Sequence, residues 1–399
     1  MKIDHVHFYV EDARACRDWF AQTLGFQAVA AIADSHTLTE VVQQGSIYFA
    51  LSSPLSPASP IAQFLQQHPP GVVDVAFLVQ DLATVMAQAI AQGAKVLEPR
   101  QQQPIQQRLG QQQLGQGCLQ WSQIAGWGNL RHTLVQRSGL TSLLPLGLES
   151  ALVRGAMPWM SDPALSQPQD QVKAQGQARE QVREVDASEV IFTQIDHAVL
   201  NVGIGELEPA IAWYEKVLGF QPQQQFAIQT EYSGLRSQVL VHPEGGAQLP
   251  INEPTSASSQ IQEFLDLNRG PGIQHIALQT DDIVAAIAQL RQRELSLLSV
   301  PTTYYSQLQQ RPGFDPAATD WQAVTKQQIL VDWQSEVSPA LLLQTFTQPI
   351  FRQPTFFFEV IERQVYRRNG QAQKAQGFGE GNFRALFEAV EREQMRRHS

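Results

Sequence analysis

The sequence of 399 residues contains a long internal repeat, and this repeat restricts the possible folds more than any other feature. The segment "IDHVHFYV" (3–10) returns as "IDHAVLNV" (195–202). Each copy is followed by an amphipathic stretch that ends in Leu-Gly-Phe. A glycine at that position is typical of a helix C-terminus, where a positive φ is needed. Each copy therefore predicts a strand followed by a helix.

A second pair of segments repeats in the same order further along the chain. "PPGVVDVAFLVQDLATVMAQAIAQGAKVL" (69–97) matches "GPGIQHIALQTDDIVAAIAQLRQRELSLL" (270–298). Both predict a strand, an Asp and a helix with apolar residues at i, i+3, i+4 and i+7. Two blocks repeated in one order indicate a duplicated chain. We expect an α+β fold with two tandem domains at 1–160 and 190–399, each made of paired βαβββ modules.

Two polar segments interrupt this pattern. Residues 161–189 are rich in Gln, Ala and charged residues, which predicts a linker that is helical in part. The run "RQQQPIQQRLGQQQLGQG" (100–117) is biased towards glutamine. A solvated hairpin around Gly110 and a chain-binding surface are both possible interpretations, and we favour the hairpin. No function is assigned to this run.

Composition excludes several classes of protein. The formal net charge of -10 argues against nucleic-acid binding, which usually needs a basic face. The two cysteines, Cys16 and Cys118, are too few for a disulfide framework and favour a reducing compartment. No signal-peptide pattern opens the chain, and no apolar run is long enough to span a bilayer. These features predict a cytoplasmic protein that binds neither nucleic acid nor membrane.

The segment "TFFFEVIERQ" (355–364) places a carboxylate inside a strand pattern. Glu359 alternates onto the same face as Phe357 and Ile361. Burial of an unpaired carboxylate costs roughly several kcal/mol, so Glu359 requires a partner.

Differences between the two copies indicate what that partner is. The second copy has two histidines and a glutamate in strand patterns, whereas the first copy keeps one histidine. The aligned pairs, second copy first, are His197 with His5, His275 with Asp74, and Glu359 with Thr133. Two imidazoles and one carboxylate form the facial triad of non-haem Fe(II) enzymes, which leaves other positions on the metal open. A single inward His is more often an ordinary core residue, but a set of three that the sister copy lacks favours a metal site. Zn or Ni with the same ligands stays possible.

At this point the chain resembles the 4-hydroxyphenylpyruvate dioxygenases of the vicinal-oxygen-chelate superfamily. The resemblance covers both halves and is specific in the second. It rests on blocks that include "LPINEP" (249–254), "SQIQEFL" (259–265), "GIQHIAL" (272–278), "TFFFEVIER" (355–363) and "GFGEGNFRALFEAVEREQ" (377–394). It implies an open barrel-like sheet in each domain and Fe(II) bound by His197, His275 and Glu359. The implied reaction converts 4-hydroxyphenylpyruvate and O2 to homogentisate and CO2, for tyrosine catabolism or prenylquinone synthesis. A homodimer or homotetramer is implied as well.

The resemblance also implies roles for pocket residues. Gln344 and Phe346 are two apart on a predicted strand and therefore face one side. Alternation would turn Gln274 away from the face of His275. The implied catalytic residues are Gln344, Asn252 and Gln260, and the implied substrate contacts are Ser237, Gln274, Phe346, Phe383 and Asn382.

The C-terminal block predicts a helix that docks on the site. Gly377, Gly379 and Gly381 would give a flexible start and Asn382 an N-cap. An apolar stripe then follows at Phe383, Leu386, Phe387 and Val390. The resemblance implies a lid that closes over the iron, with Phe383 opposite Phe346. A helix that merely caps a core is the alternative. From the sequence we expect truncation after Gln376 to leave Fe(II) binding intact and to uncouple O2 uptake from product formation.

Three rival functions stay open from the sequence. Hydroxymandelate synthase shares the fold, iron and substrate but oxidises the side chain. An extradiol ring-cleaving dioxygenase has similar modules and a His2Glu site. A metal-free binding module on this fold would leave Glu359 without its partner.

Overall fold

The structure, a computed structural model, describes residues 1–109, 112–138, 144, 190–230, 233–333, 340–368, 371–375, 377–379, 381–385, 387–388 and 390. The predicted linker at 161–189, Gly110 and Leu386 lie outside the described residues.

The first half forms one eight-stranded sheet with the order β2-β3-β4-β1-β5-β8-β7-β6. Its central strands β1 and β5 pair antiparallel and join two βαβββ modules. Its elements are β1 (Lys2–Tyr9), α1 (Ala13–Trp19), the π-helical turn η1 (Phe20–Leu24), β2 (Gln27–Ala33), β3 (Thr37–Gln44), β4 (Ile47–Pro54), α2 (Pro60–Gln67), β5 (Gly71–Leu78), α3 (Leu82–Ala91), β6 (Val96–Leu109), β7 (Gln112–Ala125) and β8 (Arg131–Ser138).

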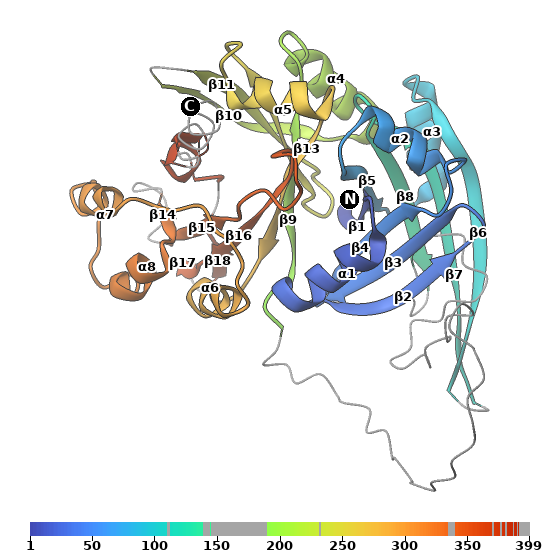
Figure 1. The fold of residues 1–399 in the computed structure, drawn as a ribbon, viewed down its shortest axis with the longest axis horizontal. Helices are drawn as coiled ribbons and strands as arrows, with labels where there is room; N and C mark the ends of the chain where they lie inside the picture. The colour runs from blue at the N-terminus through green and yellow to red at the C-terminus, as the bar shows by residue number, and fades with distance from the viewer. Residues whose placement is uncertain are drawn as a thin grey trace, which may run out of the picture.

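The second half repeats this topology position by position, with the order β10-β11-β12-β9-β13-β16-β15-β14 (Figure 1). Two helices inserted before β14 and a small hairpin after β16 are its additions. Its elements are β9 (Gln194–Asn201), α4 (Leu207–Leu218), β10 (Gln221–Gln229), β11 (Gly234–Val241), β12 (Gln248–Pro254), α5 (Gln260–Asn268), β13 (Gly272–Gln279), α6 (Ile283–Gln292), α7 (Thr302–Leu308), α8 (Trp321–Gln327), β14 (Leu330–Asp332), β15 (Leu342–Phe346), β16 (Phe357–Arg363), β17 (Val365–Arg368) and β18 (Gln371–Lys374). The predicted duplication and fold class are confirmed.

Local sequence signals explain where the repeated helices begin and end. Gly25 and Gly219, in the two Leu-Gly-Phe motifs, have φ of 78° and 74°, a backbone conformation that glycine adopts without strain. The side chains of Asp81 and Asp282 accept backbone N–H bonds at the starts of α3 and α6.

The glutamine-rich run forms the expected hairpin. Strands β6 and β7 pair antiparallel, with Gln103 opposite Leu119 and Gln107 opposite Gly115. No helix in the described residues is long and apolar enough to cross a membrane.

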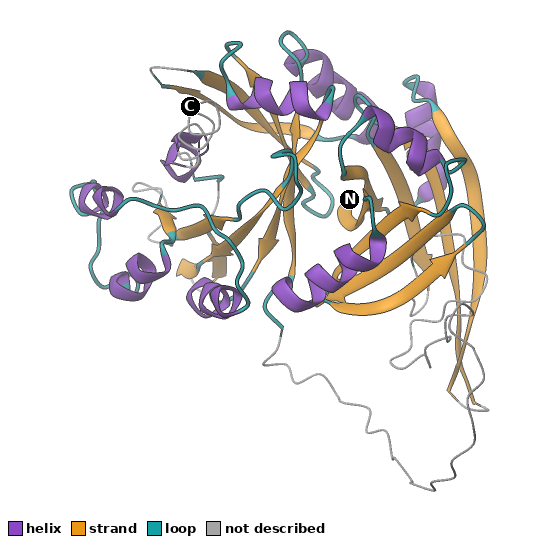
Figure 2. Ribbon diagram, in the orientation of Figure 1, coloured by secondary structure: helices purple, strands orange, loops and turns teal. Residues whose placement is uncertain are grey.

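One hydrophobic core joins the two halves, and the curved sheets lie side by side with their helices around them (Figure 2). Strand β16 is buried on both faces. On one face, Phe358 packs on Phe20 with ring centroids 5.8 Å apart, and Phe356, directly before the strand, packs on Phe8 at 5.1 Å. The opposite face carries Glu359 into the interior of the second sheet.

Candidate metal centre and substrate pocket

Three neighbouring strands bring the predicted ligands together. His197 lies on β9, His275 on β13 and Glu359 on β16, and these strands are adjacent in the sheet. Ala277 of β13 pairs with His197 on one side and with Glu359 on the other. Strand register therefore places His197 and Glu359 in one row, with His275 two residues away along β13.

The ligand atoms of the triad converge on one point. His197 Nε2 and His275 Nε2 lie 3.4 Å and 3.5 Å from Glu359 Oε2. All three ligand atoms lie within 4.8 Å of one another, and the residues are at most 2% exposed. Across the described residues, no other group of three or more His, Cys, Asp or Glu side chains has this arrangement. The donor set fits a divalent cation.

Electrostatics in the triad also favour a cation. Burial by itself raises the pKa of Glu359 and lowers that of His197, but their mutual attraction outweighs burial. The two histidines lower the pKa of Glu359 to about 2, and the carboxylates of Glu359 and Asp196 raise the pKa of His197 to about 9. Burial lowers the pKa of His275. The triad thus favours positive charge beside the carboxylate of Glu359, and a metal cation would supply that charge.

An aspartate and an arginine hold His197 from behind. His197 Nδ1 donates to Asp196 Oδ1 at 2.8 Å, which leaves Nε2 directed at the centre. Arg363 binds Asp196 through Nε at 2.7 Å and Nη2 at 2.8 Å. The sequence comparison selected residues that differ between the two copies, so it missed this pair. The first half retains the same pair as Asp4 and Arg137.

Gln344 and Asn382 hold Glu359 from the other side. Gln344 Nε2 donates to Glu359 Oε1 at 2.8 Å, and Asn382 Nδ2 donates to Gln344 Oε1 at 2.7 Å. The predicted N-cap role of Asn382 is wrong. The helix already includes residue 381, and the Asn382 side chain is fully buried against β15.

A row of polar side chains crosses the sheet beside the triad. Ser237, Asn252 and Asn201 are paired neighbours on β11, β12 and β9, and each is at most 1% exposed. Asn252 Nδ2 donates to Asn201 Oδ1 at 3.3 Å. Ser237 Oγ, Asn252 Oδ1 and Asn201 Nδ2 have no hydrogen-bond partner in the described part of the chain. Unpaired buried polar atoms are costly, so this row is suited to a polar ligand. Asn201 was missed because nothing local in the sequence marks it.

Two predicted glutamines have local surroundings that the sequence did not specify. Gln260 Nε2 donates to the carbonyl of Phe387 at 3.3 Å, so its side chain contacts the C-terminal helix. For Gln274, the pairing of β13 with β9 shifts register between Ile273 and His275, so simple alternation is not a sufficient guide to its direction, and its substrate contact stays a prediction. Such a bulge changes the direction of a side chain.

Aromatic rings line the triad. Phe357 stacks on His275 with centroids 4.8 Å apart, and Phe346 lies 6.5 Å from the same histidine. Phe383, which is partly buried, packs against the cluster that contains Phe346. Phe378, which the sequence did not single out, lies 5.0 Å from the ring of His197.

Comparisons with known proteins agree with this geometry. The family model described as "Hydroxyphenylpyruvate dioxygenase, HPPD, N-terminal" matches residues 1–114, and that of the "Glyoxalase/Bleomycin resistance protein/Dioxygenase superfamily" matches residues 194–322. An uncharacterized protein of Synechocystis is 34% identical over 391 residues, covering 98% of this chain and 97% of that protein. The 4-hydroxyphenylpyruvate dioxygenase of Dictyostelium discoideum is 34% identical over 405 residues, covering 98% of this chain and 97% of that enzyme. The chain belongs to the 4-hydroxyphenylpyruvate dioxygenase family.

A solved structure supports the fold of this family member. A mutant of 4-hydroxymandelate synthase from Streptomyces coelicolor superposes with a TM-score of 0.71 at 23% identity, and the match covers 98% of each chain. At this identity the likeness concerns the fold alone.

The first half of this dioxygenase-family chain replaces the triad with a closed hydrogen-bond network. Phe77 pairs with Leu134 as Leu278 pairs with Val360, so strand register confirms that Thr133 is equivalent to Glu359. The Thr133 backbone N–H donates to Asp74 Oδ1 at 3.0 Å, and Gln123 Nε2 donates to Asp74 Oδ2 at 2.9 Å. The Asp74 carboxylate is thus satisfied by protein donors.

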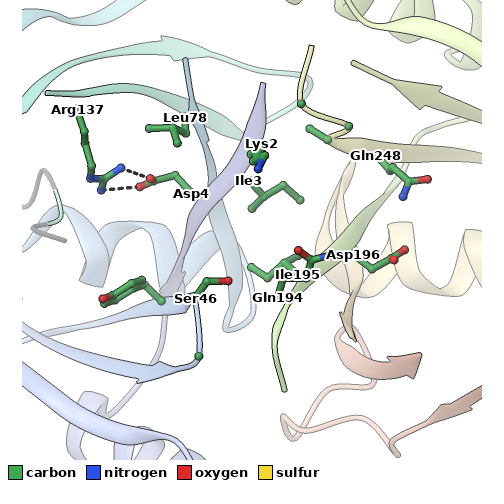
Figure 3. A pocket seen from close by; sticks show the side chains of 15 residues that line it. Lys2, Ile3, Asp4, Ser46, Leu78, Arg137, Gln194, Ile195, Asp196 and Gln248 are labelled. Atoms are coloured by element: carbon green, nitrogen blue, oxygen red, sulfur yellow. Dashed lines mark hydrogen bonds and ion pairs between the residues drawn. The ribbon is translucent and has the colours of Figure 1, made fainter. Parts of the chain in front are cut away.

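A cavity of about 510 Å³ lies between the two halves, at the starts of β1 and β9 (Figure 3). Asp4 and Asp196 line it, but His197, His275 and Glu359 do not. Both lining carboxylates are already paired with arginine and histidine. This cavity therefore reaches the support behind His197, and its lining does not include the triad.

Proposed function

We propose that this chain is an Fe(II)-dependent dioxygenase that converts 4-hydroxyphenylpyruvate and O2 to homogentisate and CO2. The observation that carries the proposal is the buried convergence of His197, His275 and Glu359 in a member of the 4-hydroxyphenylpyruvate dioxygenase family. Their Nε2 and Oε2 atoms would hold the iron. The bound iron would supply a site where the 2-oxo acid and O2 meet, with the electrons that activate O2.

Protein groups would keep the ligands in place. Asp196 keeps the Nδ1 proton of His197, so Nε2 is the free ligand atom. Gln344 occupies Oε1 of Glu359 and leaves Oε2 directed at the two histidines.

The pocket would orient the substrate through one polar and one apolar surface. The unpartnered atoms of Ser237, Asn252 and Asn201 offer a hydroxyl, an acceptor and a donor, which suit the polar groups of 4-hydroxyphenylpyruvate. The buried Phe346 and the partly buried Phe383 offer aromatic surface for its ring and would help to keep water away from the reacting atoms. Gln274 and Asn382 complete the predicted substrate contacts.

The same proposal includes the organisation of the chain. We place a metal-free domain at 1–160, a linker at 161–189 and the catalytic domain at 190–399. Assembly as a homodimer or homotetramer and a cytoplasmic location stay predictions.

An anaerobic Fe(II) titration followed by product analysis tests this function. We expect one Fe(II) per chain and homogentisate from 4-hydroxyphenylpyruvate and O2, without added 2-oxoglutarate. If 4-hydroxymandelate were the main product, the chain would be assigned to side-chain oxidation instead. A requirement for 2-oxoglutarate would contradict both assignments.

A further inference from the structure

A directed chain of hydrogen bonds connects α7 to the triad through the C-terminal segment, defined here as the described residues between 375 and 390. Tyr304 Oη lies 3.0 Å from Asn382 Oδ1, Asn382 Nδ2 lies 2.7 Å from Gln344 Oε1, and Gln344 Nε2 lies 2.8 Å from Glu359 Oε1. Each step joins side chains from a different element.

The ionised carboxylate of Glu359 sets the direction of this chain. Because a carboxylate only accepts, Gln344 must donate through its NH₂ group, which leaves its oxygen as an acceptor. Asn382 then donates to Gln344 and turns its own oxygen towards Tyr304. The Tyr304 hydroxyl accepts from the Val331 N–H at 2.9 Å, so its single hydrogen is free for Asn382 or for the Val331 carbonyl at 3.0 Å. Because the Asn382 oxygen can only accept, the chain is complete from end to end when the Tyr304 hydrogen points to Asn382 and not to the Val331 carbonyl.

A second connection reaches the other side of the triad. Arg363, which holds Asp196 behind His197, also donates through Nη1 to the carbonyls of Ala375 at 3.3 Å and Gly377 at 2.7 Å. The ring of Phe378 contacts both Arg363 and His197. Its centroid lies 5.6 Å from the Arg363 guanidinium and 5.0 Å from the centroid of the His197 ring. The C-terminal segment thus contacts the supports of both His197 and Glu359.

The backbone of this segment also approaches the triad support closely. A Cβ added to Gly379, whose φ is 62°, would lie 2.6 Å from Gln344 Oε1. Glycine is therefore needed there for contact as well as for conformation. Farther along, a cavity of about 180 Å³ separates the segment from α7 beside Tyr304, with Ala385 and Glu388 in its wall. The segment is also held farther along, where Gln260 donates to the carbonyl of Phe387 and the Gly381 N–H donates to Asp332, but among the described residues only Asn382 and Arg363 connect it by hydrogen bonds to the groups that support the triad.

We propose that metal binding at the triad and seating of the C-terminal segment are thermodynamically coupled, with Tyr304, Asn382 and Arg363 as positioning residues. A bound cation orders Glu359 and His197, and these order Gln344 and Asp196, the groups on which the segment is seated. Thermodynamic linkage makes the effect reciprocal. If metal binding raises the equilibrium constant for seating of the segment by a given factor, seating of the segment raises the metal affinity by the same factor. The inference needs only a divalent metal at the triad and does not depend on the reaction proposed above.

The test uses the full-length protein and Fe(II) under anaerobic conditions. Fe(II) affinity is measured against a chromophoric chelator, and hydrogen exchange is measured for the peptide that covers residues 377–388. We expect Fe(II) to slow exchange of this peptide in the wild type. Tyr304→Phe keeps the ring and removes the hydroxyl. It should weaken Fe(II) binding by about threefold to tenfold, less than the 10–100-fold typical of groups that touch a ligand directly. It should also speed exchange of the peptide.

Tyr305→Phe is the matched control. Its hydroxyl donates to the Ile329 carbonyl at 3.0 Å from the same helix, and no hydrogen bond joins it to Asn382. We expect wild-type Fe(II) affinity in this variant, which separates coupling from general loss of a buried hydroxyl. Unchanged exchange on Fe(II) binding, or equal Fe(II) affinities for the two variants, would overturn the coupling. A wild-type protein that binds no Fe(II) would overturn this inference and the proposed function together.

Discussion

At the scale of single residues, the duplicated chain contains its own control for the metal site. His5 and His197 occupy equivalent positions, and each donates Nδ1 to the preceding aspartate. Only His197 has a second histidine and a glutamate within reach. Glu359→Ala should therefore abolish activity and strongly weaken Fe(II) binding, because it removes the one anionic ligand. His5→Ala should leave the Fe(II) content near that of the wild type. Metal analysis of both variants checks this, and loss of half the iron in His5→Ala would contradict a single site.

Phe383 allows a second prediction at this scale. Its ring packs 5.1 Å from that of Phe226 and against the cluster around Phe346. Phe383→Ala should weaken substrate binding by about 1 kcal/mol through the loss of an aromatic contact, and Fe(II) affinity should change much less. Anaerobic titration of the Fe(II)-loaded protein with 4-hydroxyphenylpyruvate measures the effect. Equal substrate affinities would show that Phe383 contributes only to packing within the protein.

At the scale of elements, the structure changes what truncation of the C-terminal segment should do. The sequence suggests a lid whose loss leaves Fe(II) binding intact. In the structure, truncation after Gln376 removes Asn382 from Gln344 and Phe378 from His197. We therefore expect weaker Fe(II) binding as well as O2 consumption that exceeds homogentisate formation, because water then reaches the site. Fe(II) titration and parallel oxygen-electrode and product assays check both effects. A truncated protein with wild-type Fe(II) affinity and full coupling would show that the segment is only a cap.

At the scale of the whole molecule, the shared core should make the two halves unfold together. Phe358 is fully buried on the face of β16 opposite Glu359, and it contacts Phe20 and Phe49 of the first half at 5.8 Å each. Phe358→Ala should lower the free energy of unfolding by about 3–5 kcal/mol, the usual cost of a large core truncation. The exposed Ile90→Ala should change it by no more than about 0.5 kcal/mol. Denaturant unfolding followed by fluorescence and circular dichroism checks this. Two separate transitions in the wild type would contradict a single cooperative unit.

The sequence by itself determined the order of the elements, their duplication, the glutamine-rich hairpin and the triad of His197, His275 and Glu359. These features follow from local periodicity and from comparison of one half with the other, and both can be read from a single chain. The tertiary structure alone decided the partners of these residues. Arg363 binds Asp196, which lies 167 positions away in the sequence. The Asn382 side chain binds Gln344 and does not cap a helix, and Asn201 binds Asn252 because the strand register makes them neighbours. Such contacts depend on how the sheet curves and on where its strands align. No local pattern specifies either, because the energy that selects them comes from packing between distant segments.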